Sequence, residues 1–349
     1  LSMTILLAEK TLAAINQAIE ADQDDSPGRA HLGGSSIGRE CSRELWYTFR
    51  WASSKLHQAR ILRLFARGQD EENRFNAYLK QGGLTVWDVD PETGEQWRIS
   101  DVGGHFGGSL DGVVLGLQDA PDLPHVSEQK THNTKSFNAV ARQGVLASKP
   151  EHFAQMQIYM HKMNLKWALY QAVNKDNDDL YFERIAYDPQ AAEQLLRKAK
   201  NIIASEGPLE RMSDDPTWYK CKFCDFHPVC HTNTTPAMNC RTCAHSTPVL
   251  TGTAGQWKCG KHDKLIDKAA QAAGCDQHNF IPPLLANWAD PTDTDGDTVT
   301  YTNKLTGNQF VNGPSGYLSS EIAAAEDPRI IGDATTDSLR EAFNGKVAG

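Results

Sequence analysis

The sequence predicts an α/β fold in which helices flank a mixed central sheet, followed by a small metal-stapled C-terminal module. Short apolar strands and long helical patterns alternate through the first 235 residues. Eight cysteines fall into two groups of four, and the second group lies in a segment of about 40 residues too poor in aliphatic side chains to bury much core. We therefore expect a principal domain at 1–235, a metal-binding module at 236–285 and a polar C-terminal tail with a hairpin at 286–349.

The elements are placed in order by apolar periodicity, at helical spacing for helices and by alternation for strands. A helix begins at Phe153, and Trp167–Asn174 either ends this helix or starts a strand. The other expected elements are helices at 4–21, 36–50, 55–80 and 189–205, strands near 84–90, 95–101, 106–116, 124–130 and 180–187, and a hairpin within 298–311.

Composition excludes a membrane-spanning protein. The chain has 349 residues, of which 40% are hydrophobic and 23% are charged. No run of about 18 apolar residues occurs, so a transmembrane helix is not expected. Nothing resembles a signal peptide, and we therefore expect a cytoplasmic protein with reduced cysteines rather than disulfides.

Two carboxylates and a lysine are expected to converge at the hairpin formed by the strands 106–116 and 124–130. Asp111 lies in the first strand, and Glu128 and Lys130 end the second. Side chains on a strand repeat every two residues, so Glu128 and Lys130 share a face. Carboxylates bind hard divalent cations, and a lysine beside them can position a water, which is what phosphodiester hydrolysis needs. The alternative is an exposed ion pair at the strand ends.

Two helices carry further polar candidates. Gln155 and Tyr159 are four residues apart and share a helix face, with Gln157 between them. Upstream, Gly68 and Glu72 form a Gly-x-x-x-Glu pattern on the expected helix 55–80. Amphipathic helices with solvated polar faces are the alternative interpretation of both patterns.

These residues together resemble the PD-(D/E)xK nuclease superfamily, in its RecB-like and lambda-exonuclease-like branch. The resemblance covers about residues 33–232 and implies a restriction-endonuclease-like core and a metal-dependent DNA exonuclease. It implies that Mg²⁺ or Mn²⁺ is held by Asp111, Glu128 and the main-chain carbonyl of Gln129, and that Lys130 orients the attacking water. Four more residues are implied to support the site: Gln155, Gln157, Tyr159 and Glu72.

The first cysteine group joins distant parts of the chain. Cys41 stands in a Cys-x-Arg-x-Leu-Trp segment, and Cys221, Cys224 and Cys230 follow 180 or more residues later. This layout resembles the iron–sulfur nucleases, which include AddB-type enzymes and CRISPR-associated RecB-like exonucleases. The resemblance implies that these four thiolates bind a [4Fe–4S] cluster. Zinc accepts the same four sulfurs, so the spacing alone leaves both metals open.

The second cysteine group has the spacing of a zinc ribbon or knuckle. Cys240 and Cys243 form a Cys-x-x-Cys pair, and Cys259 follows. Cys275 completes the set of four sulfurs, with His262 and His278 as competitors for the fourth ligand position. A metal staple is physically reasonable for a segment this short, because it can bury little apolar surface.

The function predicted from the sequence is a metal-dependent DNA exonuclease of phage or mobile-element recombination or repair. Its partner would be single- or double-stranded DNA ends, with no membrane, and a homo-oligomer or a recombination partner protein is compatible with it. The net charge of −9 is unexpected for a DNA-binding protein, but carboxylates collect at nuclease sites. The alternatives are a non-catalytic nucleic-acid-binding protein with structural metal clusters and an iron–sulfur redox protein.

Overall fold

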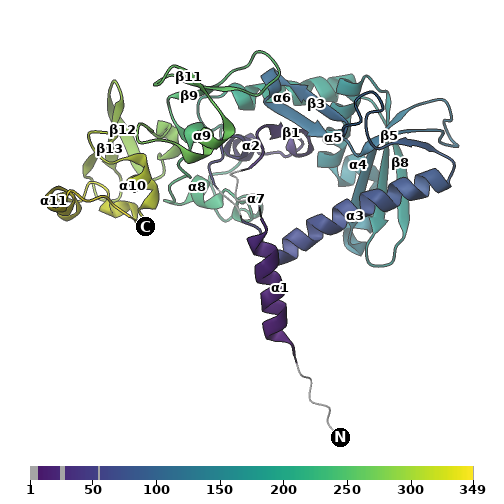
Figure 1. The fold of residues 1–349 in the computed structure, drawn as a ribbon, viewed down its shortest axis with the longest axis horizontal. Helices are drawn as coiled ribbons and strands as arrows, with labels where there is room; N and C mark the ends of the chain where they lie inside the picture. The colour runs from purple at the N-terminus through teal and green to yellow at the C-terminus, as the bar shows by residue number, and fades with distance from the viewer. Residues whose placement is uncertain (1–6, 24–27, 54–55, 349) are drawn as a thin grey trace, which may run out of the picture. The chain divides into compact units, whose positions relative to one another are not determined.

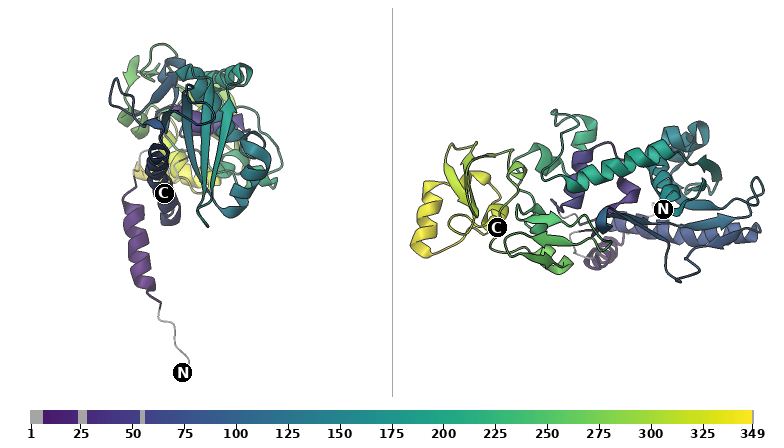
Figure 2. Two further views of the ribbon diagram at one scale, coloured as in Figure 1. Left: turned by 90° about the vertical axis from the view of Figure 1, so that its right-hand side faces the viewer. Right: turned by 90° about the horizontal axis from the view of Figure 1, so that it is seen from above.

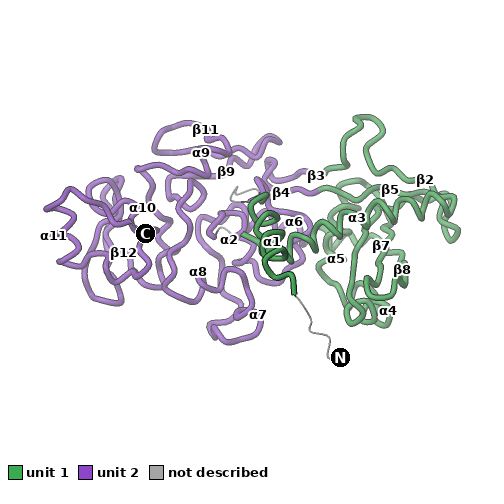
Figure 3. Tube along the Cα trace, turned by 60° about the horizontal axis from the view of Figure 1, so that its bottom comes forward, with its two compact units in different colours: residues 1–26, 55–99, 109–192 green, residues 27–54, 100–108, 193–349 purple. Residues whose placement is uncertain are grey.

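The computed structural model describes residues 7–23, 28–53 and 56–348. Contact clustering divides the chain into two compact units (Figure 3). Unit 1 consists of residues 1–26, 55–99 and 109–192, and unit 2 consists of residues 27–54, 100–108 and 193–349. Each unit is therefore assembled from segments that are far apart in the sequence.

Unit 1 is built on a five-stranded mixed sheet with helices against it (Figure 1; Figure 2, left). Its order is β2-β5-β6-β7-β8, and only the β6–β7 pair is parallel. The strands are β2 (Thr85–Trp87), β5 (Gly112–Leu115), β6 (His125–His132), β7 (Trp167–Asn174) and β8 (Leu180–Ala186). This architecture confirms the predicted α/β class with a mixed central sheet.

Capping residues and a proline explain where the helices of unit 1 begin and end. They are α1 (Glu9–Ala21), α3 (Ala59–Gln81), α4 (Thr134–Ser148) and α5 (Pro150–Met163). The side chain of Asn133 caps α4 by accepting a hydrogen bond from the Ser136 N–H, and Pro150 opens α5. Asn164 ends α5 in the left-handed region. Together α4 and α5 make the crossover that a parallel strand pair requires.

Unit 2 contains two small antiparallel sheets and several short helices. One sheet has the order β11-β10-β9 and the other β12-β13-β14. Its strands and longer helices are β1 (Leu32–Gly33), α2 (Ser42–Phe49), β4 (Phe106–Ser109), α7 (Tyr219–Lys222), α8 (His227–His231), β9 (Ser246–Pro248), β10 (Trp257–Cys259), β11 (Lys264–Ile266), α9 (Lys268–Ala273), β12 (Ala289–Asp295), β13 (Thr298–Asn303), β14 (Gln309–Asn312), α10 (Ser319–Ala324) and α11 (Ala334–Phe343).

A few remaining elements are 3₁₀ turns or span the division between the units. The 3₁₀ turns are η1 (Gly34–Ser36), η2 (Val102–Gly104), η3 (Cys240–Thr242), η4 (Pro282–Leu284) and η5 (Pro328–Ile330). Three elements have residues in both units: β3 (Arg98–Asp101), α6 (Pro189–Ala204) and β4, whose last residue, Ser109, belongs to unit 1. A further three-stranded sheet has the order β1-β4-β3.

Several sequence expectations differ from the structure. The strand expected at 106–116 is two strands in different sheets, β4 and β5, interrupted at Leu110–Asp111. Trp167–Asn174 is the buried strand β7, because α5 already ends at Met163. The helix expected at 36–50 begins at Ser42, so Cys41 caps it instead of lying in it. For the helix expected at 4–21, residues 4–6 lie outside the described residues, and the described helix begins at Glu9.

Two buried arginines in the core of unit 2 donate their hydrogen bonds to main-chain carbonyls and an amide side chain, and no carboxylate of the described residues is hydrogen-bonded to either. Arg241 donates to the main-chain carbonyls of Phe49 and Ala30 and to the side chain of Gln271, at 2.9–3.0 Å. Its guanidinium carbon lies 3.5 Å from the ring centroid of Trp51. Burial is the main cause that lowers the pKa of Arg241 to about 9. Arg50 likewise donates to three main-chain carbonyls.

His105 is buried beside these arginines, and we expect it to destabilise the fold in acid. Burial, opposed by a hydrogen bond to the Gln256 carbonyl, lowers the pKa of His105 to about 4. Arg241 and Arg50 lower it further. Above pH ~6.5 the ring is neutral in both folded and unfolded protein, and its contribution to stability is fully present. As the pH falls towards 4, only the unfolded chain takes up the proton, so stability is lost by roughly 2–3 kcal/mol.

The measurement is urea unfolding of the wild type and of His105→Gln at pH 7 and pH 5. Glutamine keeps an N–H donor but does not titrate, so its loss of stability on acidification should be smaller. Other buried histidines titrate equally in both proteins and cancel in the comparison. An identical loss in both proteins would contradict this role of His105.

No helix among the described residues is both long enough and apolar enough to cross a lipid bilayer.

Candidate active site and cysteine clusters

Asp111 stands at the break between β4 and β5, where the backbone turns sharply. The next residue, Gly112, has a φ of +148°, and a Cβ there would lie 2.9 Å from the Trp87 carbonyl oxygen. Only glycine fits this close approach without strain. The turn lets the Asp111 carboxylate accept a hydrogen bond of 2.8 Å from the main-chain N–H of Gln129 on β6. The hairpin of β5 and β6 therefore joins Asp111 to the Glu-x-Lys strand.

Glu128 and Lys130 form an ion pair on one face of β6. Glu128 is fully buried, and the Lys130 ammonium contacts its Oε1 atom. The same ammonium donates to the main-chain carbonyl of Gln129 at 3.1 Å. The alternation along the strand that the sequence predicted brings these groups together. The alternative of an exposed ion pair at the strand ends is wrong, because Glu128 has no solvent exposure.

The site is strongly acidic in its electrostatics. Burial raises the pKa of Glu128 above its ordinary value, against the opposing effect of Lys130. Burial and the nearby Asp111 raise the pKa of Glu72. Burial alone would lower the pKa of Lys130, but Glu128, Asp111 and Glu72 outweigh it and raise that pKa. Three carboxyl groups that repel one another around one cation make a site that favours additional positive charge.

The helix α5 brings one of its two candidate glutamines to the carboxylates. Gln155 donates to Glu128 Oε2 at 3.0 Å and lies 3.4 Å from the hydroxyl of the buried Tyr159. Gln157 is turned elsewhere: its amide donates to the Ala186 carbonyl and accepts from the Asp188 N–H. Residues two apart on a helix do not share a face, so Gln155 and Gln157 cannot both reach the site.

The opposite face of β6 holds a polar network that the sequence analysis missed. The Gln129 amide donates to Asn76 at 2.8 Å and to Ser127 at 3.3 Å, and Gln171 donates to Ser127 at 2.7 Å. All four residues are buried. Asn76 stands one helical turn after Glu72, and this spacing is the signal that could have identified it. These hydrogen bonds hold β6 against α3 and thereby fix the position of the Gln129 main-chain carbonyl.

A second polar cluster, also missed, lies close to Lys130. The Tyr170 hydroxyl is 2.8 Å from His132 Nε2 and 2.9 Å from His152 Nδ1. Burial lowers the pKa of His132 to about 4 and that of His152 to about 3, and the charge of Lys130 contributes to both shifts. Both imidazoles are therefore neutral at pH 7 and serve as hydrogen-bonding groups.

The thiols of the first cysteine group, in unit 2, are near enough to affect one another's pKa. Burial raises the pKa of Cys224 to about 11, and the thiols of Cys41 and Cys230 add to the increase. Burial also raises the pKa of Cys221, again with contributions from Cys230 and Cys41. The Tyr47 ring on α2 stacks on Phe226 at 5.5 Å, which holds the two ends of the group together.

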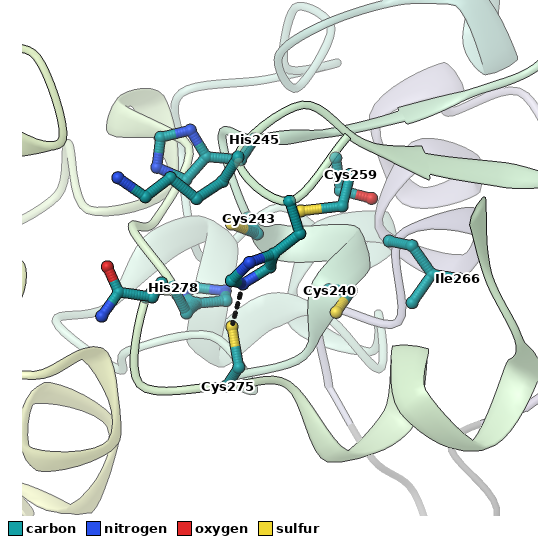
Figure 4. A pocket seen from close by; sticks show the side chains of 11 residues that line it. Cys240, Cys243, His245, Cys259, Ile266, Cys275 and His278 are labelled. Atoms are coloured by element: carbon teal, nitrogen blue, oxygen red, sulfur yellow. Dashed lines mark hydrogen bonds between the residues drawn. The ribbon is translucent and has the colours of Figure 1, made fainter. Parts of the chain in front are cut away.

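The four sulfurs of the second group surround a small cavity (Figure 4). Its volume of about 10 Å³ corresponds to a single water-sized particle. Cys275 Sγ lies 3.9 Å from His262 Nε2, whereas His278 Nε2 donates to the Asn239 carbonyl at 3.0 Å. His278 is thus engaged by the main chain, and Cys240, Cys243, Cys259 and Cys275 remain as the sulfur set.

Neither cysteine group has its side chains in the arrangement of a metal-binding site. Among the residues that the structure describes, no three or more His, Cys, Asp or Glu side chains stand in a metal-binding arrangement. The metal staples predicted from the cysteine spacing, and the divalent-metal site at Asp111 and Glu128, therefore stay predictions.

Comparison with known proteins gives structural neighbours only. No family model matches the chain, and no curated protein matches it. An alkaline exonuclease (LHK-Exo) from Laribacter hongkongensis is similar at 21% identity and a TM-score of 0.36, covering 50% of this chain and 87% of that one. The same enzyme in complex with dAMP gives 20% identity, a TM-score of 0.38 and the same coverage. SSO0001 gives 15% and 0.38, covering 63% of this chain and 96% of that one. At these values the similarity supports no assignment of substrate, so function has to be inferred from the residues of the site.

Proposed function

We propose that this protein is a metal-dependent DNA exonuclease that hydrolyses phosphodiester bonds at DNA ends. The observation that supports this best is the ion pair of the buried Glu128 with the partly exposed Lys130 on β6, with Asp111 hydrogen-bonded to the intervening residue, Gln129. A fully buried carboxylate adds little to the stability of a fold even when it is paired, because its desolvation offsets the attraction of its partner. A buried acid paired with a lysine beside a second carboxylate is therefore better explained by chemistry than by stability.

The residues present fit a hard divalent cation. The three oxygen donors are the carboxylates of Asp111 and Glu128 and the main-chain carbonyl of Gln129, and oxygen is the ligand atom that Mg²⁺ and Mn²⁺ prefer. The Lys130 ammonium contacts the second and third of these oxygens, which supports a preference of the site for positive charge. A cation bound there would polarise the scissile phosphate and make a bound water more acidic.

Residues of the chain itself would orient the water, stabilise the developing charge and position the carboxylates. Lys130 would orient the attacking water and stabilise the negative charge that develops on the phosphate. Gln155 holds the Glu128 carboxylate in place from α5, and Tyr159 supports Gln155. Glu72 on α3 adds negative charge near Asp111 and would bind the cation directly or through water.

We further propose that the first cysteine group binds a [4Fe–4S] cluster and the second binds zinc. The first set draws Cys41 and Cys230 from segments 189 positions apart and is fit to enclose a large cluster. The second set is local and surrounds a cavity of single-particle size, which suits one tetrahedral ion. Residues 1–235 would then form the nuclease domain with its cluster, 236–285 a zinc module and 286–349 an appended tail.

The biological setting belongs to the same proposal. A phage or mobile-element enzyme of recombination or repair would act on single- or double-stranded DNA ends in the host cytoplasm. The enzyme would act as a homo-oligomer or together with a recombination partner protein.

The experiment is digestion of end-labelled DNA by the purified protein with Mg²⁺ or Mn²⁺. We expect products that shorten from an end, no activity in EDTA, and recovery when either metal is restored. Ca²⁺ should bind without supporting turnover, because its looser geometry positions water poorly. Activity that persists in excess chelator would rule out the proposed mechanism. DNA binding without hydrolysis would favour the non-catalytic alternative.

The metal proposals have a separate test in two single substitutions. Protein purified without oxygen should be brown and hold roughly four irons and one zinc. Cys41→Ser should bleach the colour and lower the iron content, and Cys240→Ser should cost the zinc alone. Metal analysis and visible absorbance give the result. Colourless protein with two zinc ions would refute the cluster and leave the nuclease proposal standing.

A further inference from the structure

A groove of about 470 Å³ in unit 1 has Glu72 and Lys130 in its wall. Helix α3 forms one side with Phe65, Gly68 and Glu72, which are three and four residues apart and therefore share a face. Lys149 lies in the wall as well. Sites for single small-molecule ligands have volumes of about 300–1,000 Å³. The groove thus has room for about one nucleotide and not for a base pair with its backbones.

Gly68 keeps this groove open. It lies inside the 23-residue helix α3, its φ is not in the left-handed region, and a Cβ added there would meet no atom within 4 Å. Neither backbone conformation nor packing therefore requires a glycine. Glycine inside a helix costs about 0.5–1 kcal/mol relative to alanine. The missing side chain leaves free space on the wall between Phe65 and Glu72, which gives the glycine a purpose in ligand binding.

Phe65 presents an aromatic surface at the end of the groove. Its side chain is 51% exposed, although it is large and apolar. The ring meets His57 edge to face at a centroid distance of 5.2 Å. His57 is itself fixed, because its main chain makes two hydrogen bonds of 2.7 and 2.8 Å with the side chain of Gln23. An oriented, uncovered aromatic ring is a platform on which a nucleobase stacks, whatever its sequence.

Lys149 supplies a cation that the fold does not use. Its charge lowers the pKa of both His132 and His152, which places it beside these two groove residues. No carboxylate within the described residues forms an ion pair with Lys149. A lysine without a partner, next to neutral imidazoles, is available to a phosphate.

We propose that the groove binds the terminal nucleotide of a DNA strand unpaired from its complement. The base stacks on Phe65, the sugar passes Gly68, and the phosphate lies between Lys149 and the Lys130 site. The distance fits, because seven helical residues from Phe65 to Glu72 span about 10 Å. This inference rests on the proposed nuclease function and adds to it a preference for single-stranded or frayed ends.

The experiment measures binding of a dye-labelled oligothymidylate by fluorescence anisotropy, with Ca²⁺ replacing Mg²⁺ to prevent cleavage. Phe65→Ala should weaken binding roughly five- to a hundredfold, and Phe65→Trp should keep it. Gly68→Leu should weaken binding similarly while leaving the melting temperature unchanged or higher, because leucine is the better helix former. The matched control is Phe343→Ala, which removes a 77% exposed phenylalanine of α11 that is absent from the groove.

A second probe tests the unpaired state directly. A blunt hairpin whose terminal base pair is cross-linked should bind the wild type at least tenfold more weakly than oligothymidylate. Equal binding of the two probes, or oligothymidylate binding by Phe65→Ala within twofold of the wild type, overturns the inference. Digestion with Mg²⁺ separates the two proposals. Binding that depends on Phe65 without any cleavage contradicts the nuclease function and supports the groove as a nucleotide site. Cleavage that Phe65→Ala leaves unchanged supports the nuclease function and contradicts the proposed role of the groove.

Discussion

Replacing Lys130 by alanine should reduce the rate of DNA cleavage at saturating DNA by about a hundred- to a thousandfold or more. The lysine is placed to act on the attacking water and on the charge of the transition state, so kcat should fall while KM changes little. The buried Glu128 loses its only cationic neighbour on β6. Its pKa should then rise further, and in the absence of metal the carboxyl group becomes neutral instead of remaining a buried charge.

The check is single-turnover cleavage of end-labelled DNA together with thermal unfolding, so that loss of chemistry is separated from loss of fold. Lys80→Ala is the matched control, because Lys80 also lies 3.8 Å from a carboxylate, that of Asp88, but both side chains are about half exposed. That variant should cleave at the wild-type rate. Cleavage by Lys130→Ala at a near wild-type rate would show that the site assignment is wrong.

Replacing Arg241 by alanine should lower the free energy of unfolding by roughly 3–5 kcal/mol, because two buried hydrogen-bond acceptors and one partly buried acceptor lose their donor. These acceptors belong to Phe49, Ala30 and Gln271. The stacking of the guanidinium on Trp51 is lost as well. Lysine should restore only part of the stability, since it cannot reach several acceptors from one planar group.

Urea unfolding of Arg241→Ala, Arg241→Lys and the wild type gives these differences, provided that the dependence on urea stays the same. Arg329→Ala is the control, because Arg329 is exposed and pairs with the nearby Asp327 on the surface. Its effect should stay within about 0.5 kcal/mol. An Arg241→Ala protein within 1 kcal/mol of the wild type would contradict the role assigned to this arginine.

The parts of the site that follow strand alternation could be predicted from the sequence. Period-two alternation places Glu128 and Lys130 on one face of β6, and the hairpin pairing brings Asp111 to Gln129. Helical spacing identified Gln155 together with Tyr159. The same spacing could not separate Gln155 from Gln157, because which face of α5 meets β6 depends on tertiary packing.

The parts that depend on long-range packing could not be predicted. In the sequence, Arg241 is one basic residue inside a Cys-x-x-Cys knuckle, and nothing there indicates burial. In the structure it is buried and donates to carbonyls of chain segments about 190 or more positions earlier. The strand expected at 106–116 is divided because the backbone breaks before Gly112, where a close approach to Trp87 requires glycine. Helix α4 was missed because its apolar residues are interrupted by Gly144, which has a φ of +73°.

The central claim is that Asp111, Glu128 and the Gln129 carbonyl hold a divalent cation, and Mn²⁺ binding tests it most directly. Electron paramagnetic resonance of free Mn²⁺ during titration gives the affinity without any DNA or turnover. We predict that Asp111→Asn weakens binding at least tenfold, whereas Asp293→Asn, which changes an exposed carboxylate on β12, has no effect. Equal Mn²⁺ binding by Asp111→Asn and the wild type would contradict the account.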